Sequence, residues 1–343
     1  MGTRLKKSRL SIQDIDRPSW SDFGRLVCIS LLVLLGTSVA YFQPFGLSSD
    51  YEQYSKLFDL VRQEELQIFS ASRFEPGLSA AALVFTFFCS TNIAVFTIFV
   101  FFCLLSKFVV ISALSKSSYG FLLSALVYLV CFFPLHELTQ LRVACSTSCV
   151  FLAVLLISRN RIAIGSIPGM MAIVFHYSIV ALIPFLYRKV IKLLPAVGIA
   201  LLTYLLLAFN SQSIALYLQG KFQTVAQMGV TGFGDQAPNL LNAFNVIKIS
   251  ALILAIFRWN YLTSLMKQVV LIQLVSLGIF YGMTDFPVLA FRIFELFSIT
   301  WVIFISDGFW RKKTQSVCFV IAFLYCLPSI YLFFIAEKFF QPT

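Results

Sequence analysis

The sequence predicts an all-α fold, a polytopic transmembrane helical bundle with about nine crossings plus a broken or re-entrant element. Three observations predict it. Of the 343 residues, 59% are hydrophobic and only 12% are charged, which is about half the charged fraction of a typical soluble domain. The apolar residues gather in blocks of about 20, the length a helix needs to cross the hydrocarbon core. The basic residues lie at the ends of these blocks, where they orient membrane proteins.

The apolar blocks place the expected helices along the chain. They are expected at 24–43, 78–114, 118–134, 142–158, 162–187, 190–209, 244–257, 264–283, 287–306 and 315–336. Two of these blocks are not simple spans. The block 78–114 is longer than a bilayer requires and is interrupted at Ser90-Thr91-Asn92, and 162–187 is broken at His176-Tyr177-Ser178. Broken helices at membrane depth are tolerated only where they are buried in protein or line a wet cavity.

Lysine and arginine set the orientation. We place the basic segment 1–23 in the cytoplasm, let 78–114 cross once and let 162–187 return to its own side. The cytoplasmic side then receives 17 basic residues and the outer side eight, with Lys107 inside a helix, as the positive-inside rule requires. The predicted parts are an integral membrane domain at 24–336, periplasmic loops near 44–77 and 210–243, and a short external tail at 337–343.

The net charge of +11 is explained by this orientation, so no nucleic-acid partner is expected. The eight cysteines lie in apolar blocks, form no CxxC pair and have no histidine nearby at metal-ligand spacing. We interpret them as small hydrophobic residues, and we expect no metal site and no cofactor.

Several ionisable residues are expected together at the outer ends of the helices. Charges within a bilayer are costly, so they usually face a cavity and pair. Arginine grips phosphate through two hydrogen bonds, so three arginines converging on an outer cavity would form a pyrophosphate site. The candidates are Arg73 and Glu75 before the second helix, Glu137 and Arg142 at the fourth, Arg292 and Glu295 in the ninth, and His176 at the broken block.

Each candidate also has a structural explanation. Arg73 and Glu75 would form a solvated loop pair, and Arg142 would extend to the membrane interface. Arg292 and Glu295 lie one helical turn apart and would pair with each other. His176 would be a hydrogen-bonded core histidine, and Asp50 would cap the helix that follows it.

Short motifs along nearly the whole chain resemble those of EpsG-like, Wzy-type polysaccharide polymerases. The run from Ser49 to Tyr54, followed by Arg73-Phe74-Glu75-Pro76-Gly77, is similar to that family's Asp-x-x-x-Tyr segment and Glu-Pro-Gly-like start of the second helix. Gln140-Leu141-Arg142-Val143-Ala144 resembles its Arg-Gln-x-x-Ala helix start, although the glutamine and arginine are not adjacent here. Phe175-His176-Tyr177-Ser178 resembles its Phe-His-x-Ser element, and Arg292 lies where the family has a late arginine.

The resemblance implies a glycosyltransferase of the bacterial inner membrane, multi-pass, with its active side facing the periplasm. Such an enzyme joins oligosaccharide repeat units carried on undecaprenyl pyrophosphate into O-antigen, capsule or exopolysaccharide. The implied partners are the lipid-linked oligosaccharide, the lipid bilayer, a chain-length regulator and a flippase.

Roles for the candidate residues follow from this chemistry. The acceptor hydroxyl needs a base, and Glu75 and His176 are the candidates, with a small preference for Glu75. We expect Arg142 and Arg292 to bind the pyrophosphate, and Arg73 to lie near the sugar or the second carrier. The remaining predicted residues are Asp50 and Tyr54 as substrate-binding groups, and Glu137, Gln140 and Glu295 as supporting groups, with Glu137 holding Arg142 and Glu295 holding Arg292.

Three alternatives stay open. A flippase or transporter of the same lipid-linked sugar should carry cations along its whole pathway. Another transferase of similar layout, such as an O-antigen ligase or a membrane acyltransferase, would need a different acceptor or a catalytic histidine in another setting. A structural membrane subunit would tolerate substitution of the outer arginines.

Overall fold

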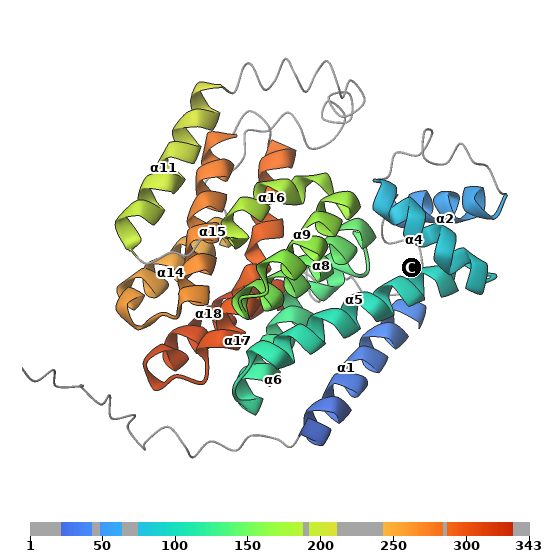
Figure 1. The fold of residues 1–343 in the computed structure, drawn as a ribbon, viewed down its shortest axis with the longest axis horizontal. Helices are drawn as coiled ribbons and strands as arrows, with labels where there is room; N and C mark the ends of the chain where they lie inside the picture. The colour runs from blue at the N-terminus through green and yellow to red at the C-terminus, as the bar shows by residue number, and fades with distance from the viewer. Residues whose placement is uncertain are drawn as a thin grey trace, which may run out of the picture.

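The computed structural model describes residues 22–42, 49–63, 75–187, 192–210, 243–283 and 287–331, and within these ranges helices are the only regular secondary structure. The first half contains α1 (Asp22–Phe42), α2 (Ser49–Arg62), α4 (Pro76–Phe88), α5 (Asn92–Leu114), α6 (Ser118–Cys131), α7 (Phe133–His136), α8 (Leu141–Ser158) and α9 (Ile162–Phe175). The second half contains η2 (Tyr177–Ala181), α10 (Ile183–Leu186), α11 (Leu193–Phe209), α14 (Ala243–Phe257), η3 (Trp259–Tyr261), α15 (Ser264–Gly282), α16 (Pro287–Ser298), α17 (Thr300–Gly308) and α18 (Lys312–Ile330). Figure 1 shows these helices packed side by side as a bundle, which confirms the predicted fold class.

Helix α8 defines the two ends of the bundle. It starts beside Arg142 and finishes at Ser158, before Arg159, so its 18 residues are about 27 Å long, close to the thickness of a hydrocarbon core. We call the two ends the Arg142 end and the Arg159 end. Each end has its own polar cavity, one lined by Arg142 and the other by Arg159.

Within the described segments the chain passes between these ends nine times. The passes are α1, α5, α6, α8, α11, α14, α15, α16 with α17, and α18. At the Arg159 end, Arg25 near the start of α1 donates to the carbonyl of Ser115 just beyond α5 (3.3 Å). The residues that follow α8 and α17, and those that begin α15, line the Arg159 cavity. Helices α11 and α15 run in the same direction, since Ala200 lies against Gly278 and Tyr204 against Gly282.

The long block 78–114 crosses once, as predicted, because α4 does not cross. Helix α4 begins directly after Glu75, which contacts Arg142. At the other end of α4, the Cys89 carbonyl accepts a hydrogen bond from Arg62 of α2 (3.3 Å). Asn92, which begins α5, donates to Ser55 of α2 (2.6 Å). Helix α4 therefore stays at the Arg142 end beside α2, a helix inside the segment 44–77 that the sequence had predicted as a loop.

The block 162–187 is the re-entrant element that the sequence predicted. Both Ile162 and Tyr187 line the Arg159 cavity, whereas His176 between them lines the Arg142 cavity. The chain therefore enters through α9, turns at His176 and returns through η2 and α10. We call this segment the re-entrant hairpin.

The expected helix 287–306 is broken between α16 and α17. Lys248 of α14 donates to the Phe294 carbonyl (3.0 Å), and Gln273 of α15 donates to the Phe297 carbonyl (2.7 Å). These side chains satisfy carbonyls that a continuous helix would bond internally. The break carries neither proline nor glycine, so the sequence pattern of this segment did not predict it.

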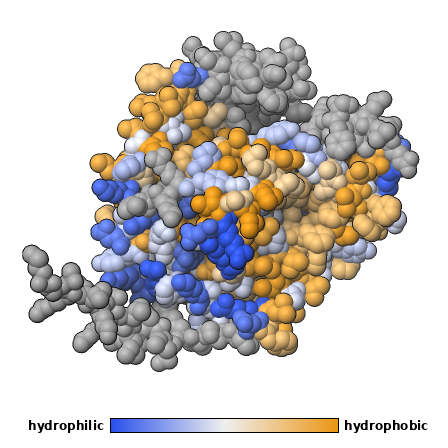
Figure 2. Space-filling model, viewed as in Figure 1, coloured by the Kyte–Doolittle hydropathy of each residue, from blue (hydrophilic) through white to orange (hydrophobic). Residues whose placement is uncertain are grey.

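The outer surface is that of a multi-pass membrane protein. Five helices are long and apolar enough to cross a membrane, namely α1, α5, α8, α15 and α18. Figure 2 shows apolar residues covering the surface over α1, α4 and α5, and large side chains such as Leu31, Leu34 and Leu35 are exposed there. All eight cysteines are free. Residues 1–21 of the predicted basic segment, the external tail and the 211–242 part of the second predicted loop lie outside the described residues.

Candidate active site

The start of α4 sets the position of Glu75. Glu75 is the N-cap in an extended conformation, and Pro76 opens the helix, where its fixed backbone angle fits and no hydrogen bond is lost. Gly77 packs against the end of α9, and a Cβ at this position would lie 2.8 Å from the Val174 carbonyl oxygen. Only glycine lets the two backbones approach this closely, so the Glu75 carboxylate lies against the tip of the re-entrant hairpin.

His176 caps the C-terminus of α9 in an extended conformation. Its Nδ1 lies 3.1 Å from Glu75 Oε1. A carboxylate only accepts hydrogen bonds, so Nδ1 carries the proton. In the neutral imidazole Nε2 is then an acceptor, and the His176 side chain lines the Arg142 cavity. This arrangement suits a proton acceptor whose tautomer is set by a carboxylate.

Arg142 binds the second oxygen of the same carboxylate. It lies in the first turn of α8, and its Nη1 is 3.2 Å from Glu75 Oε2. Burial alone would raise the pKa of the Glu75 carboxyl, but the hydrogen bond from His176 and the charge of Arg142 outweigh it and leave that pKa below its ordinary value. Glu75 is therefore an ionised group that holds His176 and Arg142, and a weak base.

Helix α2 contributes Asp50 and Tyr54 from the other side. The Tyr54 side chain is fully buried and interacts with both Arg142 and Asp50. Burial raises the pKa of Tyr54 to about 12, so this phenol is neutral at ordinary pH. Asp50 lines the cavity itself.

These groups surround the Arg142 cavity, which has a volume of about 20 Å³. Its lining comes from α2, from the start of α8, from the hairpin tip and from α16: Asp50, Gln140, Arg142, Val143, His176, Arg292, Glu295 and Leu296. A space of this size holds about one water molecule. A phosphoryl group is larger, so its binding requires the side chains to move apart.

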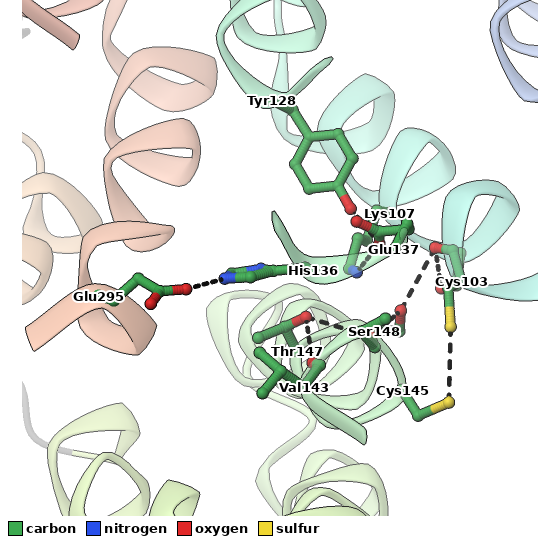
Figure 3. Close-up of polar contacts among 12 residues, drawn as sticks. Cys103, Lys107, Tyr128, His136, Glu137, Val143, Cys145, Thr147, Ser148 and Glu295 are labelled. Atoms are coloured by element: carbon green, nitrogen blue, oxygen red, sulfur yellow. Dashed lines mark hydrogen bonds and ion pairs between the residues drawn. The ribbon is translucent and has the colours of Figure 1, made fainter. Parts of the chain in front are cut away.

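A second histidine lies next to this cavity. His136, at the end of α7, is fully buried, and its Nε2 is 3.2 Å from Oε1 of the cavity residue Glu295. Figure 3 shows the imidazole reaching from α7 toward Glu295 on α16. The neighbouring Glu137 turns the other way and binds Lys107 of α5 and the hydroxyl of Tyr128 of α6. All three members of this second cluster are fully buried.

Comparison with known proteins identifies the family. A model described as the EpsG family matches residues 26–342, nearly the whole chain. The chain belongs to the EpsG family. No curated protein and no solved structure matches it. Membership of the EpsG family is consistent with a role in membrane glycan biosynthesis, and it agrees with the resemblance seen in the short motifs.

Most residues singled out in this EpsG-family sequence come together in space. Asp50, Gln140, Arg142, His176, Arg292 and Glu295 all line one cavity, and Glu75 and Tyr54 contact Arg142. Their predicted roles in binding and catalysis stay predictions. Arg73 lies outside the described residues.

Two predicted pairings in the EpsG-family chain are wrong. Glu137 does not hold Arg142. It binds Lys107, because the chain between α7 and α8 directs Glu137 into the bundle, and Glu75 takes its place beside Arg142. Glu295 does not pair with Arg292 and binds His136 instead, although the two residues are one turn apart on α16.

Neither His136 nor Lys107 was predicted from the sequence as a partner of these carboxylates. One signal was available for His136, since it stands beside Glu137 in a short polar turn between two apolar blocks. Lys107 also carried a signal, because a lysine inside an apolar span requires a buried partner.

Proposed function

We propose that this EpsG-family protein is a polysaccharide polymerase that joins oligosaccharide repeat units carried on a polyprenyl pyrophosphate. One observation carries the proposal. The Glu75 carboxylate bridges His176, a proton acceptor, and Arg142, a phosphate-binding group, beside a cavity that Arg292 also lines. Glycosyl transfer from a lipid diphosphate needs these two kinds of group at one place.

The acceptor sugar hydroxyl gives its proton to Nε2 of His176. As the proton leaves, the hydroxyl oxygen forms a bond to the anomeric carbon of the growing chain. Glu75 keeps the imidazole in the required tautomer and stabilises the imidazolium that forms. This assigns the base to His176 and a positioning role to Glu75, because the lowered pKa of Glu75 makes its carboxylate a weaker base.

The bond between the anomeric carbon and the diphosphate oxygen breaks in the same reaction. The electron pair stays on the diphosphate, whose growing negative charge is stabilised by the guanidinium groups of Arg142 and Arg292. Asp50 and Tyr54, on the α2 side of the cavity, are suited to hydrogen bonding with sugar hydroxyls.

The test is polymer synthesis by the purified protein from lipid-linked repeat units. Arg142→Lys and Arg292→Lys should each lose polymer, because an ammonium cannot reproduce the two-pronged contact of a guanidinium. Arg258→Lys is the matched control, since Arg258 is exposed at the other end of the bundle. Chain-length ladders of normal yield from both arginine variants would overturn the proposal.

The orientation proposed for this enzyme places the Arg142 end in the periplasm of the inner membrane. It rests on the 17 basic residues assigned to the cytoplasmic side against eight outside, and on the nine passes, which put the start of α1 and the end of α18 at opposite ends. A C-terminal reporter active only in the periplasm should therefore be active. Activity of a C-terminal reporter that works only in the cytoplasm would contradict the proposed orientation.

A flippase of the same lipid is the second candidate, because arginines line a cavity at each end of the bundle. Between the ends, however, the buried cation Lys107 is bound by Glu137 and Lys248 by serine hydroxyls and a carbonyl. Reconstituted vesicles separate the two functions. A polymerase joins repeat units supplied on the side of the membrane that holds the Arg142 cavity. A flippase moves the units across the membrane without joining them.

A further inference from the structure

The Arg159 end contains a cavity that the proposed chemistry does not use. Its volume is about 460 Å³, within the range of about 300–1,000 Å³ typical of ligand sites. It is lined from α5, from the turn between α8 and α9, from α10, from the start of α15, and from the turn between α17 and α18. Because so many membrane-crossing helices begin or end around it, the cavity lies at the boundary between hydrocarbon and water.

The charge of this cavity is positive. Three cations from three different segments line it, Lys116, Arg159 and Arg311. Asp307 is the one carboxylate among the described lining residues, and it already accepts a hydrogen bond from Thr263. The lining therefore carries an excess of two positive charges, which favours an anion.

Two of these cations are held against one aromatic ring. Lys116 Nζ lies 4.4 Å from the centroid of the Trp310 ring, and Arg311 Cζ lies 4.8 Å from it. The indole attracts each cation, and the Asp307 carboxylate attracts both, but two cations held near one ring still repel each other. Arg311 Nε is also buried without a hydrogen-bond partner among the described residues. An anionic oxygen in the cavity would relieve the repulsion.

The uncharged part of the lining is mixed, and apolar side chains make up a large share of it. Leu114, Leu155, Ile162 and Leu265 come from four segments and line the same space. A free phosphate ion has no apolar part to contact these side chains, whereas a lipid presents a charged phosphodiester and acyl chains together. Basic pockets between helices at a membrane surface bind anionic headgroups in this way.

We propose that the cavity lined by Lys116, Arg159 and Arg311 binds the headgroup of an anionic phospholipid, with its acyl chains against the apolar lining. The site is separate from the Arg142 cavity and does not rest on the proposed polymerase function.

The test measures lipid binding by the full-length protein in a neutral detergent. Phosphatidylglycerol, phosphatidylcholine and inorganic phosphate are titrated separately, and binding is followed by native mass spectrometry and by the shift in unfolding temperature. Wild-type protein should retain and be stabilised by phosphatidylglycerol, and should respond to neither of the other two. Stabilisation by inorganic phosphate alone at the same concentrations would show a free-anion site and overturn the lipid assignment.

The variants separate the cavity from general surface charge. Lys116→Gln with Arg311→Gln removes two charges from the lining, and Arg161→Gln with Lys312→Gln removes two from exposed neighbours that do not line it. Each basic group near an anionic lipid contributes about fivefold in affinity. The cavity pair should therefore weaken phosphatidylglycerol binding about thirtyfold, and the control pair much less. Equal loss in both would overturn the proposal.

A single matched pair guards against misfolding of the double variant. Arg159 and Arg161 stand two residues apart in the same exposed turn, and only Arg159 lines the cavity. Arg159→Gln should weaken phosphatidylglycerol binding about fivefold, whereas Arg161→Gln should leave it near the wild-type value. Identical affinities for the two variants would overturn the proposal.

Discussion

Two buried glutamates of this EpsG-family protein are each bound by a basic side chain and a second polar group, but they have different surroundings. Glu75 is bound by His176 and Arg142, and Glu137 by Lys107 and Tyr128. Both partners of Glu75 line a cavity, whereas every member of the Glu137 cluster is fully buried. The difference shows that a carboxylate and a cation together do not identify a site. What distinguishes the two clusters is whether a substrate can reach the partners of the carboxylate. We therefore propose that the Glu75 cluster acts in the reaction and that the Glu137 cluster stabilises the fold.

The largest expected effect is on the reaction. His176→Ala should lower the rate of polymer formation by about a hundredfold or more, the usual scale for loss of a general base, while the protein reaches normal abundance. The purified assay with lipid-linked repeat units measures this. A near wild-type rate would remove His176 from the reaction and break the distinction between the two clusters.

Glu75→Gln separates positioning from proton transfer in the same assay. The amide of glutamine carries no charge to hold the imidazole and to stabilise the imidazolium that forms, so the rate per folded protein molecule should fall. A variant that was only misfolded would be recovered at lower abundance, with the rate per folded molecule unchanged.

The next largest effect is on stability. Lys107→Met should destabilise the protein by about 3–5 kcal/mol, because it leaves the Glu137 charge buried without its cation. Unfolding in detergent measures this, and adding Glu137→Gln should recover much of the loss. A Lys107→Met protein of normal stability but no activity would place this cluster in the reaction instead.

A smaller effect is expected where the two backbones meet. Gly77→Ala puts a Cβ 2.8 Å from the Val174 carbonyl oxygen, which should cost about 1–3 kcal/mol of strain and move Glu75 away from His176. Activity should fall more than stability. Gly198→Ala is the control, since no atom lies within 4 Å of a Cβ placed there. Equal activity of the two variants would show that Glu75 needs no such close placement.

The smallest effect is expected at an exposed pair of the same chemistry. Lys56 and Glu52 are 2.7 Å apart on α2, with side chains 61% and 71% exposed. Lys56→Gln should change neither the unfolding temperature nor the polymer yield measurably, because water screens the pair and replaces it. A clear loss would mean that α2 binds something through this face.

The sequence predicted much of the architecture and part of the site. The hydropathy blocks and the Lys and Arg counts predicted nine passes and a re-entrant segment, because both depend on transfer between water and lipid. The residues adjacent to His176 in the sequence predicted that it lies at a helix break. The pairings between distant segments were not predicted. His136 and Glu295 are 159 residues apart, and apolar periodicity does not say which helices of a bundle are neighbours.

The break between α16 and α17 shows the same limit. Lys248 and Gln273, which belong to other helices, donate to carbonyls at the break. Ser298 and Thr300 of the segment itself donate to the same carbonyls, but such hydroxyls also occur in unbroken helices, and no proline or glycine stands between Pro287 and Gly308. The donors from other helices are a tertiary property that the segment does not reveal.

The re-entrant hairpin has a consequence for the order in which the protein is made. Its carbonyl groups are bound by side chains of two other helices. Ser146 of α8 donates to the Ala172 carbonyl (2.7 Å), and Gln268 of α15 donates to the Phe185 carbonyl (2.7 Å). Helix α8 is synthesised before the hairpin, but Gln268 follows Phe185 by 83 residues.

During synthesis, therefore, the outgoing arm lacks its partner until α15 has left the ribosome. The last turn of α10 gains its contact with Gln268 only after α15 has been made. The hairpin that carries the proposed base His176 is therefore completed late in synthesis.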